Sequence, residues 1–362
     1  MRAFPRLDNG KIDIKSLNVQ GIAQLLASLQ EPEDKALRIF QAIWQKNVRC
    51  FSDITTIPKR TRALLDSKAA IHFLASHQVL QAKDGTQKFL WRLPNGGVIE
   101  SVLIPDDNRE GGLPDRLTLC VSSQWGCAMK CSFCVTGDLG LRAQLRASQI
   151  AGQIQQVSET LSPGRRITNI VMMGMGEPLH NYDNLLTALR IMNHDFALRL
   201  SHRKITVSTV GLTPNLRRLA NELPVNIAIS LNSTTEEQRR QVMPITSKYS
   251  LENLMETCRT LPLPPGKRIT FEYVMMAGFN DSLEDASRIT TLLRDIPSKI
   301  NLIPYNENPN RESIKRPAFE KVKAFQTYLV SRGWHCSIRT TRGIDISAAC
   351  GQLGKTLTLQ SS

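Results

Sequence analysis

The sequence of 362 residues lacks any long hydrophobic run, and this absence argues against several classes of protein. No stretch approaches the roughly 18 consecutive apolar residues that a membrane-spanning helix requires. The N-terminal stretch MRAFPRLDNGKIDIK lacks the apolar centre of a secretory signal peptide. Neither a P-loop nor a glycine-rich dinucleotide fingerprint is present, and the six histidines form no zinc-protease pattern. We therefore expect a cytoplasmic globular protein.

Acidic residues are scarce relative to basic ones, because 32 Asp and Glu stand against 46 Lys and Arg. The resulting formal net charge of +14 favours a polyanionic partner, above all nucleic acid, over a merely solvated basic surface. Apolar residues make up 41% of the chain, which is ordinary for a globular protein with a sizeable core.

The residue pattern divides the chain near residue 95. Residues 12–83 carry apolar side chains at three- and four-residue spacing, which predicts a small basic helical unit. The stretch QKFLWRLPNGGVIESVLIP predicts a hairpin with its turn at residues 94–97. We accordingly expect a basic helical accessory domain over residues 1–95, a second domain over residues 96–350 and a C-terminal tail over residues 351–362.

From about residue 117 the sequence alternates between apolar runs and helical stretches. The predicted strands cover residues 117–123, 167–175, 204–209, 225–231, 269–276, 300–305 and 335–340. Repeated strand–helix units imply parallel strands joined by right-handed crossovers. Six or seven units predict an α/β fold of the partial (β/α)6-barrel type, since a full eight-stranded barrel needs more chain. An open doubly wound sheet is the alternative.

Three of the eight cysteines lie close together in CAMKCSFC, at Cys127, Cys131 and Cys134. In a cytosolic chain such clustering indicates metal or catalytic chemistry more often than structural disulfides. Three thiolates would leave one iron of a cubane cluster without a protein ligand, so that iron could bind a substrate or cofactor. Two alternatives remain open, which are one apolar helix face bearing the three cysteines and a zinc site with Cys120 as fourth ligand.

The stretch MGMGEP at residues 173–178 follows the second predicted strand. Gly174 and Gly176 would let the backbone approach a ligand closely, and Glu177 offers a carboxylate to a positive amine. The alternative is a strand-to-helix turn with a solvated glutamate. Since the cysteines follow the first strand, both motifs belong to the carboxyl-terminal rim where barrels build active sites.

The pattern CxxxCxxC with Phe133 before its last cysteine resembles the signature of radical S-adenosylmethionine enzymes. The resemblance implies a 4Fe-4S cluster held by Cys127, Cys131 and Cys134, whose open iron chelates the amine and carboxylate of S-adenosyl-L-methionine. In that superfamily the reduced cluster cleaves the sulfonium to a 5′-deoxyadenosyl radical. MGMGEP is similar to the superfamily's amine-binding motif, with Met175 in place of one glycine.

A set of landmarks along nearly the whole chain resembles one family, the radical methyltransferases that methylate C2 of adenosine in 23S ribosomal RNA and transfer RNA. The landmarks are VIESVLIP, LCVSSQWGCAMKCSFC, VMMGMGEP, SLN, VMPITSKYS, LIPYN and AACGQL. The resemblance implies a methyl-cysteine intermediate on Cys350. One S-adenosyl-L-methionine donates this methyl group and a second is cleaved, so two molecules are used per turnover.

The same resemblance implies the remaining catalytic steps. The radical removes hydrogen from the methyl group on Cys350, and the carbon radical adds to the adenine ring. Glu100 matches the family's acceptor for the C2 proton. Cys120 attacks the Cys350 sulfur, which releases the methylated base and leaves a disulfide bond that a reductant must reset. Without the resemblance, Glu100 suggests a surface glutamate on an edge strand, and the two cysteines suggest small packed residues.

The family's contacts to S-adenosyl-L-methionine correspond to Gly176, Glu177, Ser208, Ser230, Leu231, Asn232 and Asn306. The glycine and glutamate would hold the amine, and the other side chains would meet the ribose, carboxylate and adenine. Asn232 stands where the family commonly has histidine, but an amide still donates and accepts hydrogen bonds. The segment PDDNREGGLPDR, which precedes Cys120, is longer than is usual in the family.

The resemblance also implies partners. The basic helical unit would grip RNA, with Lys59, Arg60, Arg62 and Lys68 on phosphates. The target adenine would be splayed out or flipped into the barrel mouth. We further expect a low-potential electron donor such as flavodoxin, no membrane partner and a monomeric protein. Three other functions stay open, which are C8 methylation of the ribosomal adenosine, a paralogue acting on another RNA, and a zinc-stabilised RNA-binding protein without catalysis.

Overall fold

A computed structural model of the chain describes residues 4–106, 116–308 and 311–354. The long segment predicted before Cys120 lies largely outside these residues, as does the predicted tail from residue 355 onward. Within the described ranges, no helix combines the length and the apolar character that crossing a membrane requires.

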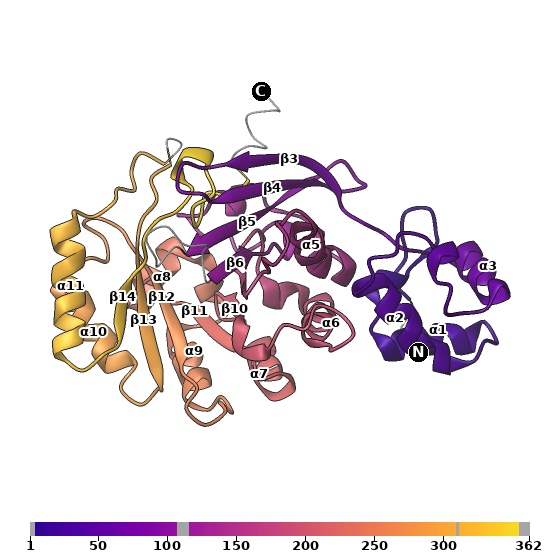
Figure 1. The fold of residues 1–362 in the computed structure, drawn as a ribbon. Coiled ribbons are helices and arrows are strands. Elements are labelled where there is room, and N and C mark those ends of the chain that lie inside the picture. Colours follow the sequence, from indigo (N-terminus) through magenta and orange to yellow (C-terminus); the bar gives the residue numbers. More distant parts are fainter. Residues whose placement is uncertain (1–3, 107–115, 309–310, 355–362) are drawn as a thin grey trace.

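The regular elements follow one another in the order that Figure 1 shows. The helices are α1 (Val19–Ser28), α2 (Ala36–Trp44), α3 (Lys59–Lys68), α4 (Val135–Asp138), α5 (Ala147–Glu159), α6 (Tyr182–Asn193), α7 (Thr213–Glu222), α8 (Glu236–Val242), α9 (Leu251–Arg259), α10 (Leu283–Leu292) and α11 (Phe319–Ser331). The strands are β1 (Ile12–Asp13), β2 (Ala69–Ala70), β3 (Ala75–Gln81), β4 (Gln87–Arg92), β5 (Val98–Asp106), β6 (Arg116–Cys120), β7 (Gln124–Gly126), β8 (Leu141–Gln144), β9 (Asn169–Met172), β10 (Ile205–Thr209), β11 (Asn226–Ser230), β12 (Ile269–Met275), β13 (Ser298–Pro304) and β14 (Cys336–Ile338).

One large sheet forms the body of the protein, with the order β14-β13-β12-β11-β10-β9-β6-β5-β4-β3. From β6 to β14 every neighbouring pair is parallel. Strands such as β12 are rich in apolar and β-branched residues and are almost wholly buried, as expected for parallel strands covered by helices. The strand order never reverses, as it would in a doubly wound sheet, so the predicted partial barrel is confirmed.

Strands β3, β4 and β5 add an antiparallel edge to this sheet. The predicted hairpin is confirmed, because the turn between β4 and β5 closes with a 2.7 Å hydrogen bond from Leu93 N to Gly97 O. The helical prediction for residues 69–81 is wrong, since these residues form β2 and β3. Most β3 side chains are exposed, so main-chain pairing with β4 decides this structure rather than an apolar helix face. The predicted boundary at residue 95 falls in the β4–β5 turn.

Helices α1 to α3 form a separate lobe beside α5 and α6 (Figure 1). The lobe is tied to α5 by the buried Asp13, whose Oδ2 accepts hydrogen bonds from Ser148 Oγ at 2.6 Å and Arg146 Nε at 3.0 Å. A second tie runs from Lys15 Nζ to Gln155 Oε1 at 2.7 Å. One cluster of buried apolar side chains continues from the lobe into the barrel, so the two parts pack as one body.

Replacing Asp13 with Ala should lower the free energy of unfolding by about 3 kcal/mol, because Arg146 and Ser148 lose their buried acceptor. Chemical denaturation of the full chain measures this change. Asp8 is exposed, so Asp8→Ala is the matched control and should change stability by less than about 0.5 kcal/mol. Equal effects of the two substitutions would show that the lobe is not anchored through Asp13.

Candidate active site

The three clustered cysteines lie on a loop between β7 and α4. Gly126, at φ 75°, starts the loop, and a Cβ there would overlap the carbonyl oxygen of Gly140. The loop is held by hydrogen bonds from Cys127 N to Gly140 O at 3.0 Å and from Ser132 N to Val242 O at 2.9 Å. The alternative that the three cysteines share one helix face is therefore excluded.

A cavity at the carboxyl ends of the barrel strands brings ten of the predicted residues together, whereas Glu100, Cys120 and Leu231 are not among the residues that line it. Its lining includes Cys127, Cys131, Cys134, Gly176, Glu177, Ser208, Ser230, Asn232, Asn306 and Cys350. These side chains come from the cysteine loop, from the ends of β9, β10, β11 and β13, and from the C-terminal segment. The predicted gathering of motifs at one rim is thus what the fold produces.

The cysteine loop has the donor set of an iron–sulfur centre. Burial raises the pKa of Cys127 to about 12 and raises the pKa of Cys131 and Cys134, so the thiols need a positive metal centre to ionise. No three His, Cys, Asp or Glu side chains among the described residues converge to hold a single metal ion. A cubane cluster instead takes one thiolate on each iron. The three thiols around one cavity therefore fit a cluster with one open iron better than zinc.

The MGMGEP stretch packs directly against the chain between β6 and β7. A Cβ on Gly176, which has φ 101°, would lie 2.5 Å from Gln124 Cβ. A Cβ on Gly174 would lie 2.7 Å from Ser122 N. Both glycines also line the cavity, so their lack of a side chain serves close packing of the protein chain and leaves the predicted approach of a ligand open.

Glu177 is buried, so the alternative of a solvated glutamate is excluded. Its two carboxylate oxygens accept hydrogen bonds from Leu179 N at 3.0 Å and from Val210 N at 2.9 Å. Burial raises the pKa of Glu177 to about 7. A buried carboxylate that faces the cavity is suited to an ammonium group, which would favour its ionised form.

The residues at the end of β11 and directly after it occupy different positions around the cavity. Ser230 and Asn232 line it, whereas the Leu231 side chain lies in the core. Asn232 adopts the left-handed backbone conformation, at φ 57°, which asparagine tolerates better than most residues. Its Oδ1 accepts from Val274 N at 2.9 Å, so this amide already holds β12 in place.

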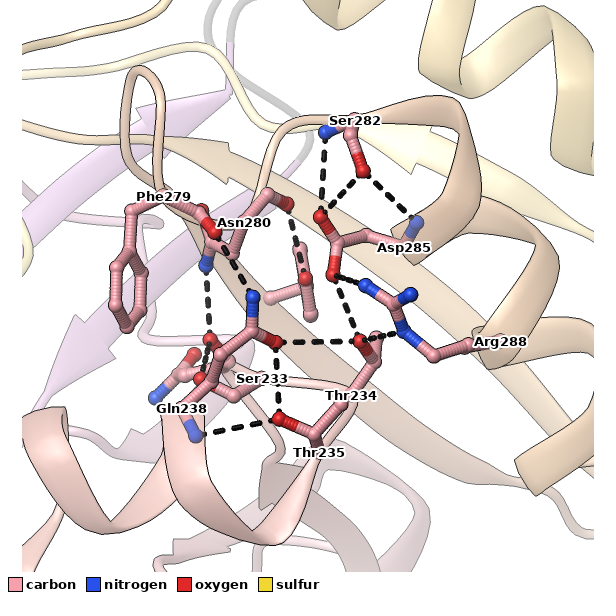
Figure 2. Close-up of polar contacts among 11 residues, drawn as sticks. Ser233, Thr234, Thr235, Gln238, Phe279, Asn280, Ser282, Asp285 and Arg288 are labelled. Atoms are coloured by element: carbon pink, nitrogen blue, oxygen red, sulfur yellow. Dashed lines mark hydrogen bonds and ion pairs between the residues drawn. The ribbon is translucent and has the colours of Figure 1, made fainter.

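Figure 2 shows the polar network that holds the chain beyond Asn232. Thr234 Oγ1 donates to Asp285 Oδ1 at 2.7 Å, and Arg288 Nε donates to the same Thr234 hydroxyl at 2.8 Å. Asn280 Nδ2 donates to Asn232 O at 2.8 Å. These bonds fix the loop after β11 to the region of α10, so Asn232 is presented by a rigid support.

Cys350 reaches the cavity because the C-terminal segment docks on the cysteine loop. Val135 N donates to Gly351 O at 2.8 Å, directly after the last cluster cysteine. Asn306 Nδ2 donates to Cys350 O at 3.0 Å, and Thr341 Oγ1 donates to Asn306 Oδ1 at 3.0 Å. The position of Cys350 next to the cluster cysteines is therefore set from both sides.

Cys120 and Glu100 lie on one face of the sheet. Val102 pairs directly with Cys120, and Glu100 is two residues from Val102, so the three side chains point the same way. Glu100 is fully buried, and its Oε2 lies 3.6 Å from Lys88 Nζ. The interpretation of Glu100 as a surface glutamate is therefore wrong.

Burial raises the pKa of the Cys120 thiol to about 12, and the nearby Cys350 contributes to this rise. All eight cysteines are within the described residues, and each is a free thiol. The predicted disulfide bond between Cys120 and Cys350 is accordingly not supported.

Two charged residues near Cys350 were missed by the sequence analysis. Arg339 follows β14, and its pKa is raised chiefly by Cys350 and also by Glu272 and Cys120. Glu272, in the middle of β12, lines the cavity and accepts from Asn301 Nδ2 at 3.0 Å. The available signal was a charged residue inside the apolar run ITFEYVMM.

Known proteins are similar to this chain in both sequence and fold. The radical SAM superfamily model matches residues 121–288. A dual-specificity RNA methyltransferase RlmN from Pelobacter propionicus is 46% identical over 344 residues, which are 95% of this chain and 96% of the relative. The chain belongs to the RlmN family of RNA methyltransferases. Membership confirms the predicted resemblance and implies a 4Fe-4S cluster and S-adenosyl-L-methionine as cofactors.

Two further relatives agree with this family. The RlmN enzyme of Geobacter sulfurreducens is 44% identical over 342 residues, covering 94% of this chain and 92% of its own. A crystal structure of a radical SAM methyltransferase from Sphaerobacter thermophilus matches with a TM-score of 0.85 and 37% identity. That match covers 94% of this chain and 98% of the solved one, so the similarity to this methyltransferase includes the N-terminal lobe.

Gly176→Ala should weaken S-adenosyl-L-methionine binding at least about tenfold, or about 1.4 kcal/mol, because the new Cβ displaces Gln124 and the cavity wall. Titration calorimetry on the reconstituted protein measures the affinity. Gly164→Ala is the matched control, because Gly164 also has positive φ, at 84°, but a Cβ there meets nothing within 4 Å. Equal losses in both variants would mean that backbone strain, rather than packing on Gln124, is responsible.

Proposed function

We propose that this chain methylates C2 of adenosine in 23S ribosomal RNA and transfer RNA, through a methyl-cysteine on Cys350. The observation that carries the proposal is one cavity lined by Cys350 together with Cys127, Cys131 and Cys134. A methyl group on Cys350 would then lie beside the cofactor site. The high identity to dual-specificity RNA methyltransferases over nearly the whole chain supports the same activity.

The cofactors would be held by the residues around this cavity. Cys127, Cys131 and Cys134 would bind the cluster, and Glu177 would bind the amine of S-adenosyl-L-methionine. The remaining contacts would come from Gly176, Ser208, Ser230, Leu231, Asn232 and Asn306. When bound, the cofactors supply the radical that activates a methyl carbon, and the proposal requires two S-adenosyl-L-methionine molecules per turnover.

The chain's own thiols and carboxylate would handle the methyl group and the protons. Cys350, as thiolate, would accept the methyl group and hold it in the cavity. Glu100 would take the C2 proton, with Lys88 beside it to favour the carboxylate form. Cys120 would attack the Cys350 sulfur, so that a sulfur–sulfur bond forms in this step alone while the bond from the Cys350 sulfur to the transferred carbon breaks and the methylated base leaves. A reductant would then restore both thiols.

RNA would be held by the basic lobe within residues 1–95. Lys59, Arg60 and Lys68 are exposed on α3 and are suited to phosphate contacts. Arg62 instead donates to Ser52 O at 2.5 Å and so also braces its own lobe. We further propose a monomer that acts in the cytoplasm with a low-potential electron donor such as flavodoxin.

The first test is anaerobic purification followed by iron, sulfide and zinc analysis and incubation with S-adenosyl-L-methionine and dithionite. The proposal expects about four irons per chain and release of 5′-deoxyadenosine. Nucleoside analysis of treated ribosomal and transfer RNA should then show 2-methyladenosine. Detection of 8-methyladenosine would assign the sister activity, and a colourless zinc protein without cleavage would overturn the enzyme altogether.

Substituting Cys350 and Cys120 one at a time separates the roles proposed for these two thiols. Cys350→Ala should abolish methyl loading and RNA methylation, because no other cysteine outside the cluster set lines the cavity. Cys120→Ala should accept the methyl group but retain RNA covalently on Cys350, because the attacking thiol is missing. Gel analysis with labelled RNA detects the adduct, and Cys50→Ala, at an exposed thiol in the lobe, is the control. Normal turnover in either active-site variant would contradict the mechanism.

A further inference from the structure

Arg239, on α8, is one of the largest fully buried side chains, at 1% exposure. Among the described residues, no carboxylate forms an ion pair with its guanidinium. Glu236 is the carboxylate that affects the pKa of Arg239 most, but its oxygens are engaged by Arg240 Nη2 at 3.2 Å and by Leu251 N at 2.7 Å. Arg239 is thus an interior cation that contacts no carboxylate within the part of the chain that the structure describes.

The hydrogen-bond partners of Arg239 are all neutral. Nη2 donates to Val210 O at 2.7 Å and to Ser230 O at 3.3 Å, and Nε donates to Leu231 O at 3.2 Å. Nη1 donates to Thr246 Oγ1 at 2.9 Å. These four bonds engage all three nitrogens and fix the guanidinium at the ends of β10 and β11, but they do not cancel its charge.

The guanidinium lies next to the cysteine loop. Val210 and Ser230, whose carbonyl oxygens it contacts, both line the cofactor cavity. Helix α8 is joined to the loop by the hydrogen bond from Ser132 N to Val242 O, at 2.9 Å, directly after Cys131. Burial lowers the pKa of Arg239 to about 10, and Cys131 gives the largest opposing effect.

Burying a cation without a counter-charge costs much desolvation free energy, so a negative group is expected near Arg239 in the cofactor-loaded protein. A 4Fe-4S cluster bound by three thiolates is anionic, and reduction adds one more negative charge. The reduction potential of such a cluster depends on the charges and hydrogen bonds around it.

We propose that Arg239 is the counter-charge of the iron–sulfur cluster, a positioning residue whose fixed positive charge at the ends of β10 and β11 makes the cluster easier to reduce. The inference rests on the cofactor part of the proposed function. It assigns Arg239 an electrostatic role that acts through Cys131 and requires no contact with RNA or with the transferred methyl group.

The test separates the effect of charge from the effect of side-chain shape by substitutions at Arg239 and at Thr246. Arg239→Gln removes the charge, and Arg239→Lys keeps it. Thr246→Asp leaves Arg239 in place but gives it a carboxylate partner, and Thr246→Asn is the neutral control of the same shape. The midpoint potential of each full-length, anaerobically reconstituted variant is measured by redox titration with paramagnetic resonance detection, and iron content is measured alongside.

Arg239→Gln and Thr246→Asp should each shift the reduction equilibrium at least about tenfold toward the oxidised cluster, which is about 59 mV for one electron. Arg239→Lys and Thr246→Asn should stay near the wild-type potential. The Thr246 pair decides the question if Arg239→Gln does not fold, because both members retain the arginine.

Equal potentials for Thr246→Asp and Thr246→Asn would overturn the inference and leave Arg239 as a structural tie between β10 and β11. That outcome differs from a failure of the proposed function, in which wild-type protein itself would bind no iron. The second result would overturn both proposals together.

Discussion

The docking of the C-terminal segment on the cysteine loop is the contact on which the proposed chemistry depends. The hydrogen bond from Val135 N to Gly351 O joins the two segments directly after the last cluster cysteine. Asn306, at the end of β13, holds the Cys350 carbonyl from the other side. Because both anchors are main-chain or amide hydrogen bonds, Cys350 is placed by backbone geometry rather than by its own weakly interacting side chain.

Burial is the second constraint, and it acts on charge. It raises the pKa of the cysteine-loop thiols, of Cys120 and of Glu177, so burial alone favours the neutral forms of these groups. Each of these groups is suited to a partner of opposite charge, which is metal for the thiols and an ammonium group for the carboxylate. Arg239 is the complementary case, because it is a buried cation that needs an anion. Under the proposed function, the charges of the cofactors would match the buried groups of the site.

The sequence predicted most strands of the barrel because their apolar runs are short and regularly separated by helical stretches. It failed at residues 69–81, where β3 is mostly exposed and its structure comes from pairing with β4. It also did not reveal that Gly174 and Gly176 pack closely on Ser122 and Gln124, which requires their lack of a side chain. Such contacts join segments far apart in the chain, and no local pattern encodes them.

By itself the sequence determined the cluster of three cysteines, the glycine-rich motif, the order of strand–helix units and the family, because local spacing and residue type are enough for these. Only the tertiary structure decided that Glu100 is buried beside Lys88, that Cys120 shares its sheet face, and that Arg239 is buried at the ends of β10 and β11. The physical reason is that register, burial and desolvation depend on which distant segments meet, and these quantities set the charge of each group in the site.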